Sequence, residues 1–285
     1  MILIFDQKVR WNMAEVRLTK ERMKEAFLRY LDDIFELPEI ISGCVKEINI
    51  TRENKNMTAG QAFEAGFHDI YSDTDLFLRV RLPKDSQVTP EDYMKRMDRF
   101  GVTDDTALGW MFVPADHVCR VIFKNGMRYD LIFEFEYEGD GPFVLEPCAG
   151  EDENANWPTG NISRFWFIQI QALGKLYRRD YLISAHLANM NCNDTLVMQM
   201  RKRDLEYGTS HHRYGHSEQL EYAGYLGKMP YGTGDPVFDQ IADRLYAAAK
   251  AYDRLVKDFY PGYQDRSDDF FAIWDSYTSG QVSVI

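Results

Sequence analysis

A segment rich in glycine, proline and acidic residues, from residue 137 to residue 161, divides this chain of 285 residues into two halves with different patterns. It contains Glu-Gly-Asp-Gly-Pro and Pro-Thr-Gly, so no long helix or strand fits within it, and it is either a linker or the rim of a site. Short strand patterns alternate with helical ones before it, whereas the periodicity after it is almost wholly helical. We therefore expect an α+β protein, with a mixed α/β domain over residues 1–150 and a helical domain over residues 151–285.

Apolar residues three and four positions apart predict the helices. One spans residues 18–37, where Thr19 can cap the start, and another begins at Thr89-Pro90 and runs to about Arg99. In the second half the same spacing predicts helices over residues 162–190 and 237–260.

Alternating apolar and polar residues predict the strands of the first half, which cover residues 45–51, 74–82, 118–123 and 127–136. Asn125-Gly126 separates the last two, and this pair is typical of a tight hairpin turn. We therefore expect residues 118–136 to form a β-hairpin.

Composition narrows the possible partners. The chain has 33 Lys and Arg residues against 45 Asp and Glu, a formal charge of −12, which disfavours nucleic acid and favours cationic small molecules or proteins. The four cysteines show no Cys-x-x-Cys spacing, which fits a reducing cytoplasm better than a disulfide framework or a zinc ribbon. No apolar run approaches the roughly 18 residues of a membrane span, so we expect neither secretion nor membrane insertion.

Three aspartates are candidates for metal-dependent chemistry. Asp73 and Asp75 begin a predicted strand and share one of its faces, because side chains two apart in a strand point the same way. Asp130 lies on the polar face of a later strand, opposite a face of Tyr129 and Leu131. Three carboxylates at one point repel one another unless a cation such as Mg²⁺ lies between them. The alternative is that Asp73 and Asp75 only cap backbone groups at a turn.

In the order of its motifs the chain resembles a known family. The features are the Asp-x-Asp that opens an apolar strand, the stretches Asn125–Leu131, Arg164–Trp166 and Gly174–Leu182, and finally Tyr246–Arg254 and Tyr260–Tyr263. Together they resemble the nucleotidyltransferase superfamily, and within it the aminoglycoside 6-adenylyltransferases, whose activity on streptomycin gives antibiotic resistance. The resemblance implies a nucleotidyltransferase-type domain followed by a helical domain.

The resemblance also implies an activity, the Mg²⁺-dependent transfer of AMP from ATP to a hydroxyl of a streptomycin-like aminoglycoside. Asp73, Asp75 and Asp130 would be both the catalytic residues and the metal ligands. Two alternatives stay open: a catalytically weakened binding module of the same fold, and a nucleotidyltransferase that acts on a different acceptor.

Four residues are candidates to bind the nucleotide. Where the superfamily has a Gly-Ser pair before the Asp-x-Asp, the best-spaced residues here are Gly60 and Gln61, although Gly60 also suits an ordinary turn or helix start. Lys175 and Arg178 project from one side of a predicted helix and could grip phosphates. A solvated face, or a salt bridge to Asp180, fits these two residues as well.

A cationic acceptor calls for acidic side chains. Glu134 and Glu136 share the strand face of Asp130, and Glu146 with Glu151–Glu153 follow in the segment between the halves. These residues are candidates to bind an aminoglycoside. The alternative is a solvated strand face followed by a solvated linker.

Overall fold

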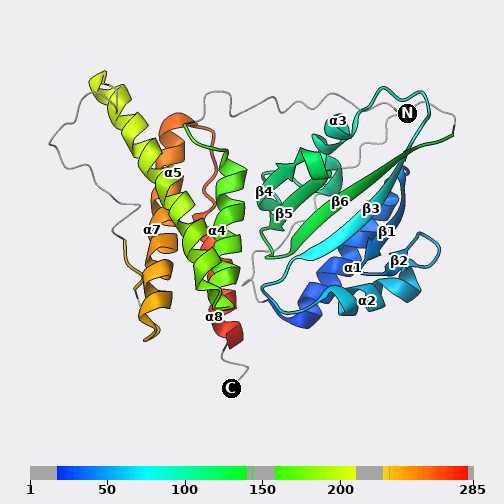
Figure 1. Cartoon of the computed structure of the whole chain (residues 1–285), viewed down its shortest axis with the longest axis horizontal. Helices are drawn as coiled ribbons and strands as arrows, with labels where there is room; N and C mark the ends of the chain where they lie inside the picture. The colour runs from blue at the N-terminus through cyan, green and yellow to red at the C-terminus, as the bar shows by residue number, and fades with distance from the viewer. Residues whose placement is uncertain (1–17, 140–142, 144–157, 210–226, 231, 282–285) are drawn as a thin grey trace.

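The computed structural model of the chain describes residues 18–139, 143, 158–209, 227–230 and 232–281, and it is an α+β structure with one mixed six-stranded sheet (Figure 1). The first half contains α1 (Lys20–Glu36), β1 (Ile40–Val45), β2 (Ile48–Ile50), α2 (Lys55–Gly66), β3 (Thr74–Leu82), α3 (Pro90–Met94), β4 (Ala107–Val113), β5 (Val118–Phe123) and β6 (Arg128–Tyr137). The second half contains α4 (Ile162–Tyr177), α5 (Tyr181–Tyr207), α7 (Pro236–Phe259) and α8 (Ser267–Gln281). The boundary expected at residue 150 lies outside the described residues.

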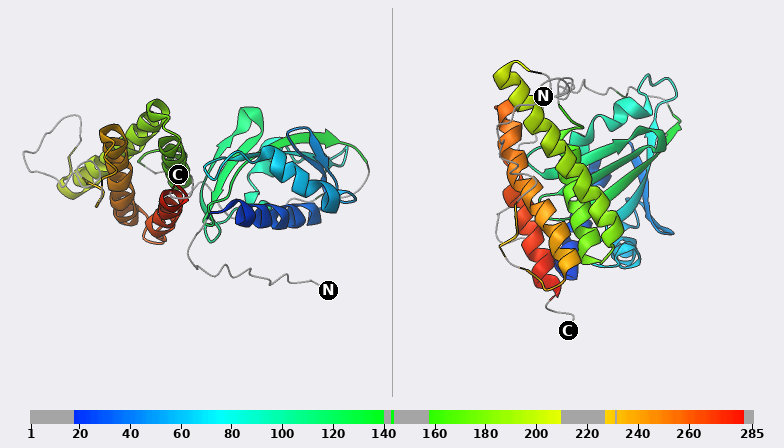
Figure 2. Two further views of the ribbon diagram at one scale, coloured as in Figure 1. Left: turned by 90° about the horizontal axis from the view of Figure 1, so that it is seen from below. Right: turned by 60° about the vertical axis from the view of Figure 1, so that its left-hand side comes forward.

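The strands are ordered β2-β1-β3-β6-β5-β4, and β3 and β6 at the centre run parallel while the other neighbours are antiparallel. α1 and α2 cover one face of this sheet (Figure 2), where Phe27 and Tyr30 of α1 pack against Tyr129 of β6. β3 follows a strict alternation in which every second side chain, from Thr74 to Leu82, is buried on this face of the sheet. The polar side chains of β3 and β6 therefore point to the other face of the sheet.

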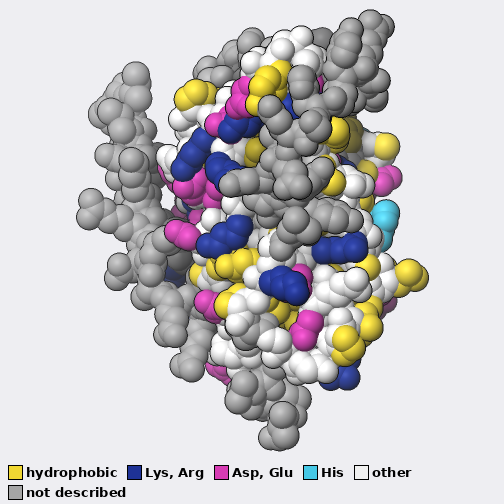
Figure 3. All heavy atoms as spheres, turned by 90° about the vertical axis from the view of Figure 1, so that its left-hand side faces the viewer, with side chains coloured by type: hydrophobic (Ala, Val, Ile, Leu, Met, Phe, Trp, Pro, Cys, Tyr) yellow, Lys and Arg dark blue, Asp and Glu magenta, His cyan; other side chains and the backbone are white. Residues whose placement is uncertain are grey.

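The helical half packs beside the sheet through α4, which lies between β4 and the helices α5 and α7 (Figure 1). Gly109 of β4 makes this contact possible. A Cβ atom built at Gly109 would lie 2.4 Å from the carbonyl oxygen of Ser163 and 2.5 Å from the backbone nitrogen of Phe167. Only glycine allows the α4 backbone to approach the strand this closely. The side of the helical half turned away from the sheet mixes charged and apolar side chains (Figure 3).

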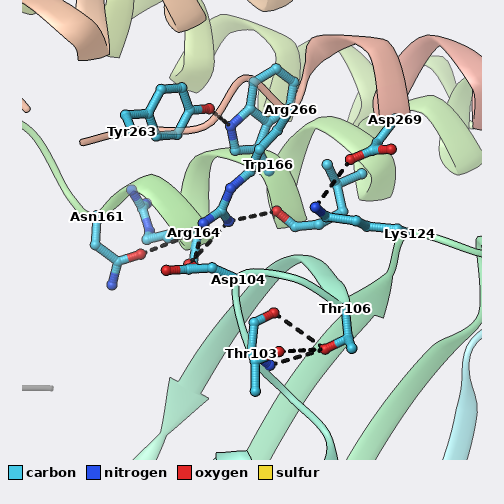
Figure 4. A network of polar contacts seen from close by, with 12 residues as sticks. Thr103, Asp104, Thr106, Lys124, Asn161, Arg164, Trp166, Tyr263, Arg266 and Asp269 are labelled. Atoms are coloured by element: carbon cyan, nitrogen blue, oxygen red, sulfur yellow. Dashed lines mark hydrogen bonds and ion pairs between the residues drawn. The ribbon is translucent and has the colours of Figure 1, made fainter. Parts of the chain in front are cut away.

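A buried arginine fastens α8 to the sheet (Figure 4). Arg266, which is 6 % exposed, donates hydrogen bonds to the carbonyl oxygen of Leu108 at 2.8 Å and to Asp104 at 2.6 Å. Lys124 in the β5–β6 turn forms an ion pair with Asp269 of α8 at 3.4 Å. Residues far apart in the sequence thus hold the two halves in one fixed arrangement.

The structure confirms the helix at residues 18–37, with Thr19 as its cap, and the β5–β6 hairpin. The strand predicted at residues 45–51 is shorter than expected: it is β2, Ile48–Ile50, because Lys46 adopts a left-handed conformation with φ 55° and turns the chain between β1 and β2. The helix predicted over residues 162–190 is two helices. Arg179, with φ 61°, ends the first, and the Asp180 side chain caps the second by accepting a hydrogen bond from the Ile183 backbone N–H.

Other elements also differ from the sequence-based predictions. The helix expected to reach Arg99 stops at Met94 and is followed by a short 3₁₀ turn over Met97–Phe100. The helices α2 and α8 and the strands β1 and β4 were not predicted. No helix in the described part of the chain has the length and apolar character needed to cross a membrane.

Candidate active site

Two of the three predicted aspartates stand side by side in the centre of the sheet. Asp75 of β3 and Asp130 of β6 are register partners, so their backbones are separated by one strand spacing, about 4.8 Å. Both occupy the face opposite α1 and α2. Asp73 lies two residues before Asp75, where the chain enters β3. The alternation of β3 and its parallel pairing with β6 therefore place Asp75 beside Asp130, with Asp73 near the start of the same strand, on the face that the sequence predicted for them.

The charges of these aspartates influence one another. Burial, together with the negative charges of Asp73 and Asp75, raises the pKa of Asp130 to about 6 against the opposing charges of Arg120 and Arg128. A carboxylate with a pKa of about 6 is partly protonated near neutral pH, unlike an ordinary aspartate. The carboxylates of the site therefore repel one another, and a bound cation would reduce this repulsion.

Two arginines that the sequence analysis did not assign to the site lie among these carboxylates. Arg120 of β5 is the register partner of Asp130, and its Nε lies 3.0 Å from Oδ2 of Asp130. Arg128 of β6 is buried, and it donates to the carbonyl oxygen of Tyr71 at 3.1 Å and to Asp73 at 3.4 Å. The available signal was the strand alternation, which places Arg120 and Arg128 on the face of Asp130.

Arg178 holds the turn that leads into β3. It donates to both carboxylate oxygens of Asp69, at 2.7 and 3.0 Å, and to the Ser72 hydroxyl at 2.6 Å. Although partial burial alone would raise the pKa of Asp69, the hydrogen bonds and charge of Arg178 outweigh it and hold that pKa below its ordinary value. Arg178 was predicted to bind phosphates, and the structure places it instead on Asp69 and Ser72, next to Asp73. Lys175 forms an ion pair with Asp180 at 3.7 Å, which was the alternative to a phosphate contact.

Gly60 and Gln61 do not lie near these carboxylates. They occupy the middle of α2, on the opposite side of the sheet, and Gln61 is exposed. The sequence predicts a phosphate-binding pair at this position. The structure corrects this expectation, because the backbone N–H groups in the middle of a helix are already bonded to its own carbonyl groups. A turn with free N–H groups, as a phosphate cradle needs, is not formed at this position.

Glu134 and Glu136 also differ from the prediction. Both lie on the predicted face of β6, but Arg79 and Arg81 on the neighbouring strand pair with them at 3.2 and 2.7 Å. Their charges are thus largely balanced within the sheet, which leaves little to attract a cationic acceptor. Phe77, 47 % exposed, follows Asp75 on the same face and separates it from these pairs. The other acidic residues expected to bind an acceptor, Glu146 and Glu151–Glu153, lie outside the described residues.

The oxygen donors of this site suit Mg²⁺ in kind. In the described part of the chain no three His, Cys, Asp or Glu side chains are arranged to hold a metal ion as they stand, since Asp73 and Asp130 face arginines. However, Mg²⁺ is commonly bound by one or two carboxylates together with the phosphates of its substrate. The adjacent carboxylates of Asp75 and Asp130, with the raised pKa of Asp130, fit that mode of binding.

Comparison with known proteins does not assign the chain to a family. No family model matches it, and a search of curated proteins finds no match.

Proposed function

We propose that this protein is a Mg²⁺-dependent nucleotidyltransferase that transfers AMP from ATP to a hydroxyl of a cationic small molecule, an aminoglycoside of the streptomycin class. The observation that carries the proposal is the pairing of Asp75 with Asp130 on adjacent parallel strands, with Asp73 beside them. Nucleotidyl transfer uses Mg²⁺ to neutralise the anionic phosphates, and adjacent carboxylates are the side chains that would hold this ion.

The residues of the site would have distinct roles. Asp75 and Asp130 would hold the cation, which, when bound, neutralises the phosphates and makes the acceptor hydroxyl more acidic. Asp73 would complete the set of carboxylates on release from Arg128. Asp130 would also serve as the base that accepts the proton of the hydroxyl. Arg178 would keep the turn before Asp73 in place.

The choice of acceptor depends on the sequence resemblance and on the formal charge of −12, which attracts a polycation. It does not depend on Glu134 or Glu136, because arginines balance both.

The experiment is mass spectrometry of streptomycin after incubation with the purified protein, ATP and Mg²⁺, with the Asp75→Asn variant as control. We expect a product heavier by one adenylyl group from the wild-type protein alone. A screen of other hydroxyl-bearing acceptors follows if streptomycin is unchanged, and a product there would identify a nucleotidyltransferase with a different acceptor.

A second candidate function is a binding module of the same fold that has lost catalysis. The observation that favours it is the position of Gly60 and Gln61 inside α2, which leaves no phosphate-cradling turn at the expected place. Calorimetry with ATP and Mg²⁺, combined with the product assay, separates the two functions, because a module without a phosphate-binding turn would release little heat on titration with ATP and form no product.

A further inference from the structure

One guanidinium and two carboxylates form a straight row across three neighbouring strands. Arg120 of β5 is the register partner of Asp130, and Asp130 is the register partner of Asp75. All three side chains belong to the face of the sheet opposite α1 and α2. A cation held by Asp75 and Asp130 would therefore have Arg120 on the next strand, about one strand spacing away.

The three arginines of the site differ in how firmly they are held. Arg128 is 6 % exposed and donates hydrogen bonds to Tyr71 and Asp73, while Arg178 donates to Asp69 through two nitrogens. The side chain of Arg120 is 37 % exposed. Its Nε lies 3.0 Å from Asp130 but is buried without making a hydrogen bond to any described residue. Arg120 is thus attracted to Asp130 by charge alone and is the arginine best able to exchange its partner.

We propose that Arg120 binds a phosphate group of the nucleotide, and that its guanidinium leaves Asp130 when a cation and a nucleotide occupy the site. The inference rests on the proposed function and deepens it by naming the group that binds the phosphates. An arginine suits this role because its planar guanidinium donates two parallel hydrogen bonds to phosphate oxygens. Neither Gly60 nor Lys175 is placed to do so, since Gly60 lies in α2 and Lys175 pairs with Asp180.

The same exchange explains why a guanidinium is useful beside Asp130. Without ligands, the positive charge of Arg120 balances the carboxylate of Asp130, which is 14 % exposed and is also repelled by Asp73 and Asp75. A cation competes with Arg120 for that carboxylate, and the freed guanidinium then faces the phosphates that the cation brings. Arg120 and the cation would therefore compete in the absence of nucleotide and support each other in its presence.

The test is calorimetric titration of the full-length protein with an ATP analogue that carries a methylene group between the α- and β-phosphates, in the presence of Mg²⁺. Arg120→Gln is compared with the wild type and with Arg79→Gln, a matched control on the same face whose arginine pairs with Glu134. We expect Arg120→Gln to raise Kd about ten- to a hundred-fold, the loss typical of a charge-assisted hydrogen bond. Arg79→Gln is expected to leave Kd unchanged, and Arg120→Lys to recover part of the loss.

Two further titrations identify the contact. Pyrophosphate with Mg²⁺ should lose affinity in Arg120→Gln as the analogue does, whereas Mn²⁺ alone should bind that variant more tightly because its competitor is gone. Equal Kd values for the analogue in the wild type and in a folded Arg120→Gln variant would overturn the inference and leave the proposed function standing. A wild-type protein that binds neither the analogue nor Mn²⁺ would overturn both.

Discussion

Asp130 of β6 lies directly opposite Asp75 of β3 in the only parallel pairing among the described strands. Burial and the nearby negative charges of Asp73 and Asp75 disfavour the ionised form of Asp130, so its place in the centre of the sheet costs stability at neutral pH. Such groups are typical of functional sites, where residues are retained for activity at the expense of stability. The predictions below test this interpretation.

Asp130→Asn should make the protein more stable and less active. The folded-state pKa of Asp130 is about 6, above the ordinary aspartate value, so the native state binds more protons than the unfolded state between about pH 4 and pH 6. Stability is therefore lost as the pH rises through that window. At pH 7 the ionised Asp130 therefore lowers the free energy of unfolding of the wild type by roughly 2–3 kcal/mol. Asp130→Asn removes this cost but leaves Arg120 unpaired, so we expect the free energy of unfolding to rise by a net amount of about 1–2 kcal/mol.

Urea denaturation of the wild type and of Asp130→Asn at pH 4 and pH 7 measures this effect. The stabilisation should be present at pH 7 and nearly absent at pH 4. A variant that is less stable than the wild type at pH 7 would show that Asp130 is a structural ion-pair partner of Arg120.

Arg178 and Asp69 should act as a coupled pair that positions Asp73. The pair is about one third exposed, so its loss should cost only about 1 kcal/mol in the free energy of unfolding. Activity should fall at least ten-fold in Arg178→Met, because the turn before Asp73 loses three hydrogen bonds. In a double-mutant cycle, adding Asp69→Asn to Arg178→Met should cause little further loss. Additive losses would mean that Arg178 acts elsewhere, as in the phosphate contact that the sequence suggested.

Replacing Gly109 and Gly60 by alanine should change the stability of the protein in opposite directions. Gly109→Ala should destabilise the protein by about 2–4 kcal/mol, because the added methyl group meets the backbone of α4 and cannot be accommodated by a side-chain movement. Gly60→Ala should stabilise it by about 0.5–1 kcal/mol, since the position is helical and its nearest neighbour is the end of the Lys24 side chain at 3.8 Å. Thermal melting of both variants checks the two signs.

Gly60→Ala also tests the site assignment. Nucleotide affinity should be unchanged in this variant, because Gly60 lies on the opposite side of the sheet from Asp75. A large loss of affinity would return the phosphate-binding role to Gly60.

The elements of the first half could be predicted where the signal was local. The hairpin of β5 and β6 depends on an Asn-Gly turn between two apolar segments, and α1 has both a cap and an apolar stripe. α2 was missed because its start lacks a side-chain cap and its buried face consists of small residues and Phe63. The break before α5 depends on one left-handed residue, Arg179, which no periodic pattern reveals.

The site could be predicted in part for a different reason. Alternation fixed the face on which each aspartate lies, but the order of the strands, which makes Asp75 and Asp130 neighbours, is a property of the whole sheet. The partner of a long side chain is even less local. Arg178 was expected to face phosphates because it is a helix-surface arginine, and it reaches instead to Asp69, 109 residues earlier in the chain.

The central claim is that the α-phosphorus of ATP is transferred to a hydroxyl, and labelled ATP tests it without knowledge of the acceptor. The protein is incubated with Mg²⁺, a mixture of aminoglycosides and ATP labelled at either the α- or the γ-phosphate. We predict that the α-label alone appears in an acceptor, with one pyrophosphate released for each label transferred, and that Asp75→Asn abolishes both. Transfer of the γ-label, or α-label transfer that survives in Asp75→Asn, would contradict the assignment of this site.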